Sequence, residues 1–414
     1  MRRIRHIQDV VDWGLCVGCG ACASVCEKSG VSLVHIDTEG IRPVFDHQRC
    51  AGCTDCLFVC PGYGIDSEAF RKGWGALAEE NLLIGPSLEI WEGHAASPDI
   101  RYRGSSGGAV TALALYCLER EGMRFVLHTG MDPERPWRNV TVKSRSGAEL
   151  ILRAGSRYCP SSPCEALRDI EESDGPCVFI GKPCDAAAAI AVSSQRPRLR
   201  RNLGLVLTFF CAGPPCTKGT LSQLDRLGIR KEQVREIRYR GHGWPGEFTV
   251  VYDGGERRNS LSYKEAWGSL AKHHRSFRCH LCPDGLGEIA DVSCGDAWHR
   301  YAADGNPGRS LVVARTARGR DILRKAMTEG YLDLVPSNPE NVAAAQGLVK
   351  RRQQVFGRLL AMRLLLVPTP DYRGFPLFRA WRETSIVSRA KTVLGTLKRL
   401  VLRGLWRRNP VPGV

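Results

Sequence analysis

The stretch CVGCGACASVC at residues 16–26 returns in similar form as CAGCTDCLFVCP at residues 50–61. Each run has the spacing CxxCxxCxxxC, which is the ligand spacing of bacterial two-cluster ferredoxins. In that spacing the first three cysteines of a run bind one 4Fe-4S cluster, and the fourth binds the other. The sequence therefore predicts one cluster bound by Cys16, Cys19, Cys22 and Cys60. It predicts a second cluster bound by Cys50, Cys53, Cys56 and Cys26.

Zinc ligation and disulfide formation are the two other uses of so many cysteines. Zinc sites use two CxxC pairs, whereas each run here contains four cysteines. Glu27 stands where proline usually follows the fourth cysteine, but this departure removes no ligand. Gly18, Gly20 and Gly52 permit the tight turns that wrap a loop around a cluster. We therefore expect iron–sulfur clusters in this segment.

The overall composition is that of a globular protein with metal-binding cysteines. The chain has 414 residues, of which 43% are apolar and 25% charged, so collagen-like and wholly disordered chains are excluded. Its N-terminus, MRRIRHIQDVVDWGLC, lacks the apolar core of a secretory signal peptide. No run of about 18 apolar residues predicts a membrane span. Because cytosolic thiols stay reduced, the 18 cysteines favour metal ligation in a cytoplasmic protein.

Three segments differ in composition, and together they predict an α+β fold. Residues 1–75 form the cysteine-rich, two-cluster ferredoxin-like module. Residues 80–370 mix apolar runs such as CVFIG and SLVVAR with helical stretches such as GRDILRKAMTEG, which predicts a mixed α/β domain. Residues 371–414 form a basic, helical C-terminal tail.

Seven further motifs follow the second cysteine run. They are RYRGSSGGAVTAL at 101–113, GSRYCPSSPCEAL at 155–167, GKPCDAAA at 181–188, FFCAG at 209–213, RYRGHGWPGEF at 238–248, CHLCPDGLGEIADVSCGDAW at 279–298 and GRSLVVARTARG at 308–319. In this order they resemble the beta-subunit family of coenzyme F420 hydrogenase/dehydrogenase, from about Cys16 to about Asn341. The resemblance implies a flavin-binding α/β domain with FAD and at least one further iron–sulfur cluster. It also implies redox chemistry linked to ferredoxin or to the deazaflavin coenzyme F420.

The expected cofactor-binding residues form two short loops and one lysine. The first loop, SSGG, precedes a helical stretch that begins near Ala109, and free amides at a helix N-terminus bind anions. The same residues would suit an ordinary capped helix, but the resemblance favours the pyrophosphate of FAD. The second loop and the lysine of GKPC are added because of the resemblance. The full set is Ser105, Ser106, Gly107, Gly108, Gly155, Ser156, Tyr158 and Lys182.

Four of the remaining ten cysteines are expected to bind a third 4Fe-4S cluster, an expectation that leans on the resemblance. Two of them follow apolar strand-like runs, at the strand ends where α/β sheets place ligands, and two form a CxxC pair. The four are Cys184, Cys211, Cys279 and Cys282. Buried free cysteine also packs as a small apolar residue, so this ligand set stays open. Cys216 and Cys294 are the substitutes.

Polar residues near these motifs are weaker candidates for catalysis. Asp291 and Asp296 follow a strand-like run, where each would meet a ribose hydroxyl or Lys182, or cap a turn. His242 and the pair at 273–274 could donate a proton to a reduced substrate, although a histidine in a surface loop is the commoner case. The sequence identifies no catalytic acid.

The C-terminal tail carries half of the net charge of +16. Between Arg379 and Arg408 there are nine basic residues and one acidic residue, Glu383. Helical spacing groups Val393, Leu397, Leu400 and Val401 into an apolar stripe, with Leu405 further on. Such a helix lies on an anionic membrane surface, docks on a partner, or packs on its own domain, and the sequence leaves these alternatives open. Nucleic-acid binding is not expected, because no nucleic-acid-binding motif accompanies the charge.

Two functions follow from these patterns. The first is an iron–sulfur flavoprotein oxidoreductase that passes electrons between its clusters and FAD and reduces or oxidises a small acceptor, coenzyme F420 or a ferredoxin-linked substrate. The second is a non-catalytic electron-transfer subunit of a larger redox complex. The expected partners are an acidic ferredoxin, attracted by the basic surface, or another redox subunit. We expect a cytoplasmic protein, with peripheral contact to the inner membrane as one role of the tail.

Overall fold

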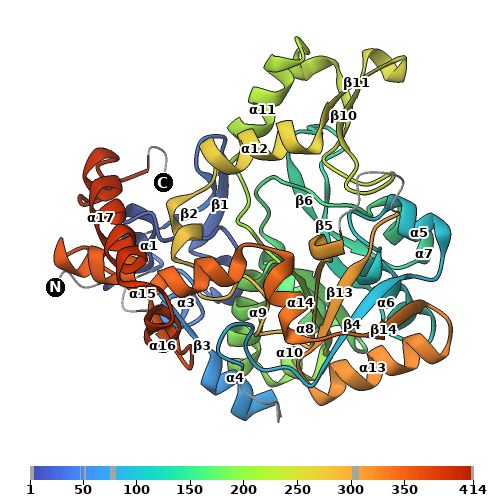
Figure 1. Ribbon diagram of the computed structural model, residues 1–414, viewed down its shortest axis with the longest axis horizontal. Helices are drawn as coiled ribbons and strands as arrows, with labels where there is room; N and C mark the ends of the chain where they lie inside the picture. Colours follow the sequence, from blue (N-terminus) through green and yellow to red (C-terminus); the bar gives the residue numbers. More distant parts are fainter. Residues whose placement is uncertain (1–3, 47, 51–52, 75–80, 301–306, 412–414) are drawn as a thin grey trace.

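An eight-stranded mixed sheet organises most of the chain (Figure 1). The computed structural model describes residues 4–46, 48–50, 53–74, 81–300 and 307–411. The strand order is β14-β4-β13-β12-β8-β7-β5-β6, in which the central strands β12, β8, β7 and β5 are parallel and their flanking strands antiparallel. The strands are β4 (Glu89–Ala95), β5 (Val126–Met131), β6 (Asn139–Ser144), β7 (Cys177–Gly181), β8 (Leu203–Phe209), β12 (Val292–Asp296), β13 (Ser310–Ala314) and β14 (Leu332–Pro336).

Helices cover both faces of this sheet, which is why its central strands are almost wholly apolar. Val178 and Ile180 of β7 pack in the cluster formed by α6 and α13, whereas Phe179 between them packs on α9. This alternation follows from the two-residue period of a strand. The covering helices are α5 (Pro98–Arg103), α6 (Ala109–Glu119), α7 (Gly147–Leu152), α8 (Leu167–Glu172), α9 (Pro183–Gln195), α10 (Pro197–Asn202), α13 (Ala317–Thr328) and α14 (Pro339–Ala345).

A smaller antiparallel sheet is inserted between β8 and β12 and lies at the top of Figure 1. Its strands are β9 (Val234–Arg238), β10 (Glu247–Tyr252) and β11 (Arg257–Ser262), and its helices are α11 (Thr217–Arg226) and α12 (Tyr263–His273). Phe248 and Leu270 lie in its separate apolar core. Short 3-10 turns connect the elements at η1 (Pro163–Ala166), η2 (Lys231–Gln233), η3 (Asp253–Gly255), η4 (Phe277–Leu281) and η5 (Trp298–Arg300).

The N-terminal module is built from short helices and a hairpin. Its elements are α1 (Ile7–Asp12), α2 (Ala21–Val25), β1 (Val31–Ile36), β2 (Gly40–Phe45), α3 (Asp55–Phe58), β3 (Gly64–Asp66) and α4 (Ser67–Trp74). Gly20 caps α2 with a positive φ of 86°, and a Cβ there would lie 2.9 Å from the backbone nitrogen of Glu165. The cysteine loop therefore approaches the α/β domain closely because glycine occupies this position.

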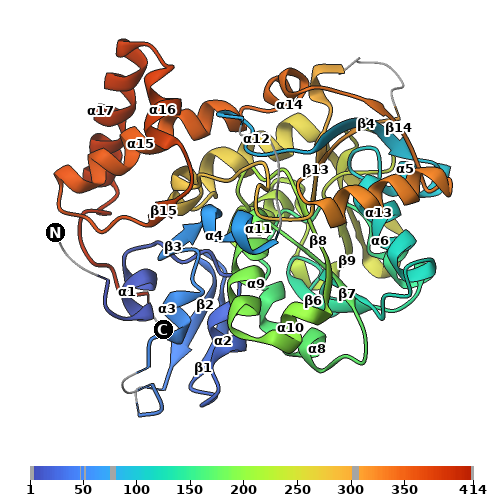
Figure 2. The same ribbon diagram turned by 90° about the horizontal axis from the view of Figure 1, so that it is seen from below.

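The C-terminal segment folds back onto the N-terminal module (Figure 2). It consists of α15 (Leu348–Leu364), β15 (Asp371–Arg373), α16 (Leu377–Arg382) and α17 (Ile386–Leu402). Strand β15 pairs in parallel with β3, and the guanidinium of Arg408 forms ion pairs with Asp9 at 3.2 Å and Asp12 at 2.6 Å. Residues 371–411, part of the expected basic tail, are thus hydrogen-bonded to the first segment of the chain. Of the helices that the structure describes, none has both the length and the apolar character needed to cross a bilayer.

Candidate functional site

The structure brings the first predicted set of thiols together in a buried position between the N-terminal module and the α/β domain. Burial raises the pKa of Cys22 well above its usual range, and the thiolates of Cys19, Cys16 and Cys60 raise this pKa further. The thiolates of Cys19 and Cys16 act in the same direction on the pKa of Cys60. The nearby backbone amides of Tyr63 and Gly62 act in the opposite direction and lower the pKa of Cys60. Four grouped thiols match the ligand set of a 4Fe-4S cluster.

The second predicted set lies at the solvent side of the module. Cys26, Cys50, Cys53 and Cys56 line one cavity of about 80 Å3, together with charged residues. Burial and the thiolate of Cys26 raise the pKa of Cys50, and the amide of Gly30 donates to the Cys26 sulfur at 3.2 Å. The exchange of fourth cysteines between the two runs is therefore present in the fold: Cys26 joins the second run, and Cys60 joins the first.

The third set of thiols comes from three separate places in the α/β domain. Cys184 lies in the first turn of α9, Cys211 follows β8, and Cys279 and Cys282 flank the end of η4. Burial raises the pKa of Cys282 to about 12, an effect that the thiolates of Cys211 and Cys279 reinforce. Burial also raises the pKa of Cys184. The charge of Asp185 adds to this increase, and so do the thiolates of Cys211 and Cys282. The four thiols predicted from the sequence therefore interact with one another.

The two substitute cysteines do not join this third set. Cys216 precedes α11, and Cys294 lies on β12, where burial is the single cause that raises its pKa to about 12. Within the described ranges, no three histidine, cysteine, aspartate or glutamate side chains lie close enough to bind one metal ion.

Two buried cations lie between the first and the third thiol sets. The Lys182 ammonium contacts Asp185 at 2.6 Å and Ser161 Oγ at 3.0 Å. Burial opposes its charge, but Asp185 and the thiolate of Cys184 outweigh this effect and raise the Lys182 pKa. The second cation, Arg278, is 2% exposed and donates to the carbonyl of Pro61 at 2.6 Å, directly after Cys60.

Arg278 has thiols around it instead of a carboxylate. Among the residues that the structure describes, no carboxylate lies within ion-pair distance of its guanidinium, and its Nε has no hydrogen-bond partner. Burial would lower the Arg278 pKa, but Tyr372 and the thiolates of Cys282, Cys184 and Cys279 raise it. A buried charge without a counter-charge is strongly destabilising, so this position calls for an anionic group at the third set.

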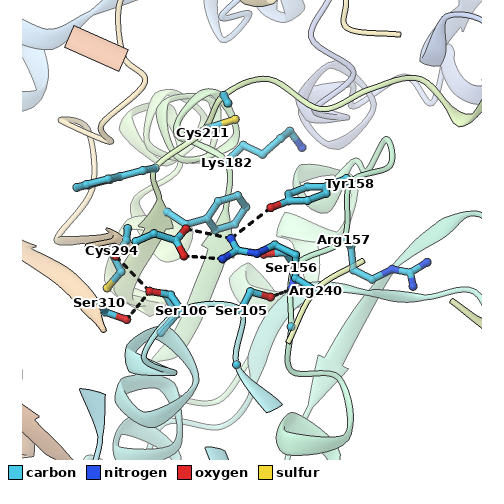
Figure 3. Close-up of a pocket in the computed structure, with 18 of the residues that line it drawn as sticks. Ser105, Ser106, Ser156, Arg157, Tyr158, Lys182, Cys211, Arg240, Cys294 and Ser310 are labelled. Atoms are coloured by element: carbon cyan, nitrogen blue, oxygen red, sulfur yellow. Dashed lines mark hydrogen bonds and ion pairs between the residues drawn. The ribbon is translucent and has the colours of Figure 1, made fainter. Parts of the chain in front are cut away.

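A pocket of about 580 Å3 lies next to the third thiol set. In the view of Figure 3, Cys211 and Lys182 lie at one side of it and Ser105 and Ser106 at the other, with Arg240 between them. Most of the predicted cofactor-binding residues line this pocket: Ser105, Ser106, Gly108, Gly155, Ser156, Tyr158 and Lys182. Cys211 belongs both to the third set and to the pocket wall.

The two predicted loops meet at the start of α6. Ser105 Oγ accepts a hydrogen bond of 2.6 Å from the amide of Ser156, which joins them. Gly108 caps α6 with a positive φ of 77°, and the first turn of the helix opens onto the pocket. Gly107 faces the sheet instead of the pocket: its amide donates to Ser310 Oγ at 2.9 Å, and a Cβ there would lie 2.6 Å from the carbonyl oxygen of Gly93. The loop therefore presents a helix N-terminus, which favours anions, to the pocket.

Sequence reasoning missed the ion pair at the centre of the pocket. The Arg240 guanidinium binds both oxygens of Asp296, at 3.0 and 2.6 Å. It lies over the rings of Tyr263 and Trp298, 4.8 and 5.4 Å from their centroids. Asp296 thus pairs with Arg240 and not with Lys182. The motif RYRGHGW contains Arg240, but no local pattern indicates a partner 56 residues further along the chain.

The other weak candidates lie away from the pocket. Asp291 is buried and forms an ion pair with Arg318 at 2.5 Å, so it is part of the domain core. His242 packs on the ring of Tyr102, and His274 Nε2 lies 3.4 Å from Ser222 Oγ. Neither these two histidines nor His273 is among the lining residues, so none is positioned to protonate a ligand bound there.

The motif order and the site agree with a known family. Residues 90–168 match the family model for the N-terminal part of the coenzyme F420 hydrogenase/dehydrogenase beta subunit, and residues 176–340 match the model for its C-terminal part. The chain belongs to the coenzyme F420 hydrogenase/dehydrogenase beta-subunit family. Residues 10–65 match a "4Fe-4S dicluster domain", so this family member carries such a domain at its N-terminal end.

Named relatives of this F420 beta-subunit family member are distant. The chain is 23% identical over 310 residues to "Coenzyme F420 hydrogenase subunit beta" of Methanothermobacter thermautotrophicus, a match that covers 70% of this chain and 100% of that relative. It is 24% identical over 266 residues to "F420-dependent formate dehydrogenase 1 subunit beta" of Methanococcus maripaludis, covering 62% of this chain. The second match spans 64% of that relative, less than two thirds of its length.

A solved structure has the same fold. It is a chain of the F420-reducing [NiFe] hydrogenase complex from Methanosarcina barkeri, with a TM-score of 0.53 at 20% identity, covering 69% of this chain and 94% of that one. At this identity the likeness concerns the fold alone. The two matched models of the F420 beta-subunit family extend no further than residue 340, so α15, α16 and α17 lie beyond the region that they describe.

Proposed function

We propose that this chain is an iron–sulfur flavoprotein oxidoreductase. Electrons pass between 4Fe-4S clusters bound by the three thiol sets and FAD bound in the pocket, and the final partner is a small acceptor, coenzyme F420 or a ferredoxin-linked substrate. The observation that carries the proposal is the position of Cys211, which belongs to the third thiol set and also lines the pocket. A cluster bound there would lie beside any cofactor in the pocket.

The residues around the third set support an anionic cluster. Cys211 receives a hydrogen bond of 3.3 Å from the amide of Gly213, and such donors stabilise cluster sulfurs. Arg278 supplies a buried positive charge that interacts with the thiols of Cys282, Cys184 and Cys279. A cluster with four thiolate ligands would give Arg278 the counter-charge that it otherwise lacks.

The pocket residues support a flavin with a pyrophosphate. The first turn of α6 offers backbone amides at its positive end, which is the site where a pyrophosphate would be held. The hydrogen bond between Ser105 and Ser156 would fix the two loops around it. FAD, when bound, supplies the chemistry that couples one-electron clusters to a two-electron acceptor. The raised pKa keeps Lys182 protonated, so this residue holds a positive charge at the cluster side of the pocket.

Cofactor analysis of anaerobically prepared protein tests this proposal. We expect about 8 or 12 iron atoms per chain with equal sulfide, for two or three clusters, and about one FAD released on denaturation. Zinc without sulfide would end the iron–sulfur assignment. FMN in place of FAD, or no flavin in reconstituted protein, would end the proposed mechanism.

The non-catalytic alternative is kept because the named relatives are subunits of hydrogenases and dehydrogenases. In that case another redox subunit does the chemistry, and this chain relays electrons through its clusters. The two functions differ in one measurement, the reduction of coenzyme F420 by the isolated, fully loaded chain with an artificial electron donor. Turnover by the isolated chain supports the enzyme, and turnover that requires a partner subunit supports the relay. In both cases we place the protein in the cytoplasm, where its thiols stay reduced.

A further inference from the structure

Helix α17 packs on the protein through a side that carries both apolar and polar residues. Thr396 and Leu400 are buried, and the guanidinium of Arg389 lies 5.6 Å from the ring of Trp381. On the facing helix α15, a Cβ added at Gly357 would lie 3.2 Å from Thr392 Cγ2, so a glycine allows the threonine side of α17 to approach closely. The side that meets the protein therefore carries threonines and arginines as well as leucine.

The opposite side of α17 is aliphatic and faces solvent. Five of its side chains are 54% to 75% exposed, and two exposed lysines stand among them. We call this surface the α17 outer face, and it consists of Ile386, Val387, Lys391, Leu394, Lys398, Val401 and Leu402. Positions 387, 394 and 401 repeat every seven residues, close to two helical turns, and so form one row. A surface helix usually has one apolar side, turned towards the core, whereas α17 also carries aliphatic side chains on its solvent side.

This outer face differs from the apolar stripe expected from the sequence. Leu400 is buried against the protein, Val393 and Leu397 are half-buried, and Val401 alone of that group is exposed. Leu405 and Trp406 also pack against the apolar core. Packing on the domain therefore uses the expected stripe, and a second aliphatic row remains outside.

The charge around the outer face is mainly positive. Between Arg379 and Arg408 there are nine basic side chains and one acidic side chain, Glu383, which lies just before the start of α17. Figures 1 and 2 both show α17 at the edge of the molecule, away from the eight-stranded sheet. The outer face contains aliphatic side chains and lysines but no carboxylates. It is therefore complementary to a surface in which apolar chains lie beneath negatively charged groups.

We propose that α17 anchors the protein on the surface of an anionic bilayer. The helix lies parallel to the membrane, and the side chains of Val387, Leu394 and Val401 enter the boundary between headgroups and acyl chains. Lys391 and Lys398 extend their aliphatic stems along this boundary and place their ammonium groups beside lipid phosphates. The attachment is peripheral and salt-sensitive, because attraction between exposed charges is screened within about 8 Å at physiological ionic strength. It does not depend on the proposed redox function.

Sedimentation of the full-length holoprotein with vesicles tests the anchor. We expect it to sediment with vesicles made of equal parts phosphatidylglycerol and phosphatidylcholine at low salt, to be released at high salt, and to stay mostly in solution with phosphatidylcholine alone. The variant Val387→Ser/Leu394→Ser/Val401→Ser should bind at least about tenfold more weakly, since three inserted aliphatic side chains are lost. The variant Leu152→Ser alters an equally exposed leucine on α7 and should bind like the unmodified protein.

A second variant separates charge from apolar insertion. Lys391→Gln/Lys398→Gln should weaken binding to anionic vesicles and reduce its salt dependence, while iron content shows that the fold is retained. Failure of the unmodified protein to sediment with anionic vesicles overturns the proposal, as does equal binding by the triple-serine variant. If the protein is a dimer that the triple-serine variant makes monomeric, and neither form binds vesicles, the outer face is a protein interface and the proposal is wrong.

Discussion

Each of the three thiol sets consists of four cysteine side chains. The two sets of the N-terminal module are nevertheless built differently from the third set, in the α/β domain. Within each run of the module, neighbouring cysteines are separated by two or three residues, so the loops themselves group them. In the third set, Cys184 and Cys282 are almost a hundred residues apart and meet because α9, β8 and η4 converge. Local spacing therefore builds the first kind of set, and tertiary packing builds the second.

The surroundings of the sets also differ. Charges of both signs surround the second set at the solvent side of the module, namely Asp46, Asp55, Lys28 and Arg49. In the buried third set, the charges of Arg278, Arg351 and Arg275 act on Cys279. Positive charge stabilises a reduced cluster, which carries one more negative charge than the oxidised cluster. Clusters with the same four cysteine ligands can therefore differ in reduction potential.

The largest effect is expected from removing half of the third set. Cys279→Ala/Cys282→Ala should lose about 4 of about 12 iron atoms per chain and abolish electron transfer to the pocket. Iron analysis and the absorbance of the remaining clusters measure this. Cys216→Ala, which removes a thiol outside the set, is the matched control and should keep all its iron. Unchanged iron in the double variant would mean that this CxxC pair is structural.

A substitution at Gly107 is expected to change flavin binding in the pocket without changing the iron content of the thiol sets. The added Cβ of Gly107→Ala would lie 2.6 Å from the carbonyl oxygen of Gly93, so the start of α6 must shift. We expect flavin affinity to fall roughly tenfold, with a loss of about 1–3 kcal/mol in stability and unchanged iron. Gly268→Ala has open space around its Cβ and serves as the control. Equal flavin affinity in both variants would argue against α6 as the pyrophosphate site.

Arg278→Gln tests the charge of the buried set. Losing this cation should lower the reduction potential of the third cluster on the order of 100 mV, since a buried unit charge several ångströms away contributes roughly 2 kcal/mol. A redox titration followed by electron paramagnetic resonance measures the shift. Arg373→Gln changes an exposed arginine paired with Asp371 and should leave all potentials unchanged. A third-cluster potential that stays constant in Arg278→Gln would remove the role assigned to this cation.

The smallest effect is expected at the solvent side of the module. The Asp55 carboxylate lies 3.3 Å from Cys53 Sγ, but it is exposed, and water and salt screen its charge. Asp55→Asn should therefore raise the potential of the second cluster by roughly 20 mV or less. The same titration measures it. A shift as large as that of Arg278→Gln would contradict the contrast between the exposed and the buried set.

Many residues of the candidate site could be predicted from the sequence, but some of their contacts could not. The helix expected near Ala109 begins at that residue, and seven of the eight predicted cofactor-binding residues line the pocket. The start of a helix can be predicted because its capping residues are neighbours in the chain. The pairing of Arg240 with Asp296 could not be predicted, because nothing in a single sequence indicates that two residues 56 positions apart are in contact.

The family, the mixed helix-and-sheet architecture and the grouping of the eight N-terminal cysteines could be predicted from the amino-acid sequence, because fixed spacing along a chain fixes geometry over one or two turns. The packing of distant segments fixes which dispersed cysteines meet, which charges are buried among them and which side of α17 faces outward. The periodicity of α17 contains two aliphatic rows, and helical spacing alone does not choose between them. Packing against α15 makes this choice: Thr396 and Leu400 are buried, Gly357 leaves room for Thr392, and the row of Val387, Leu394 and Val401 faces solvent.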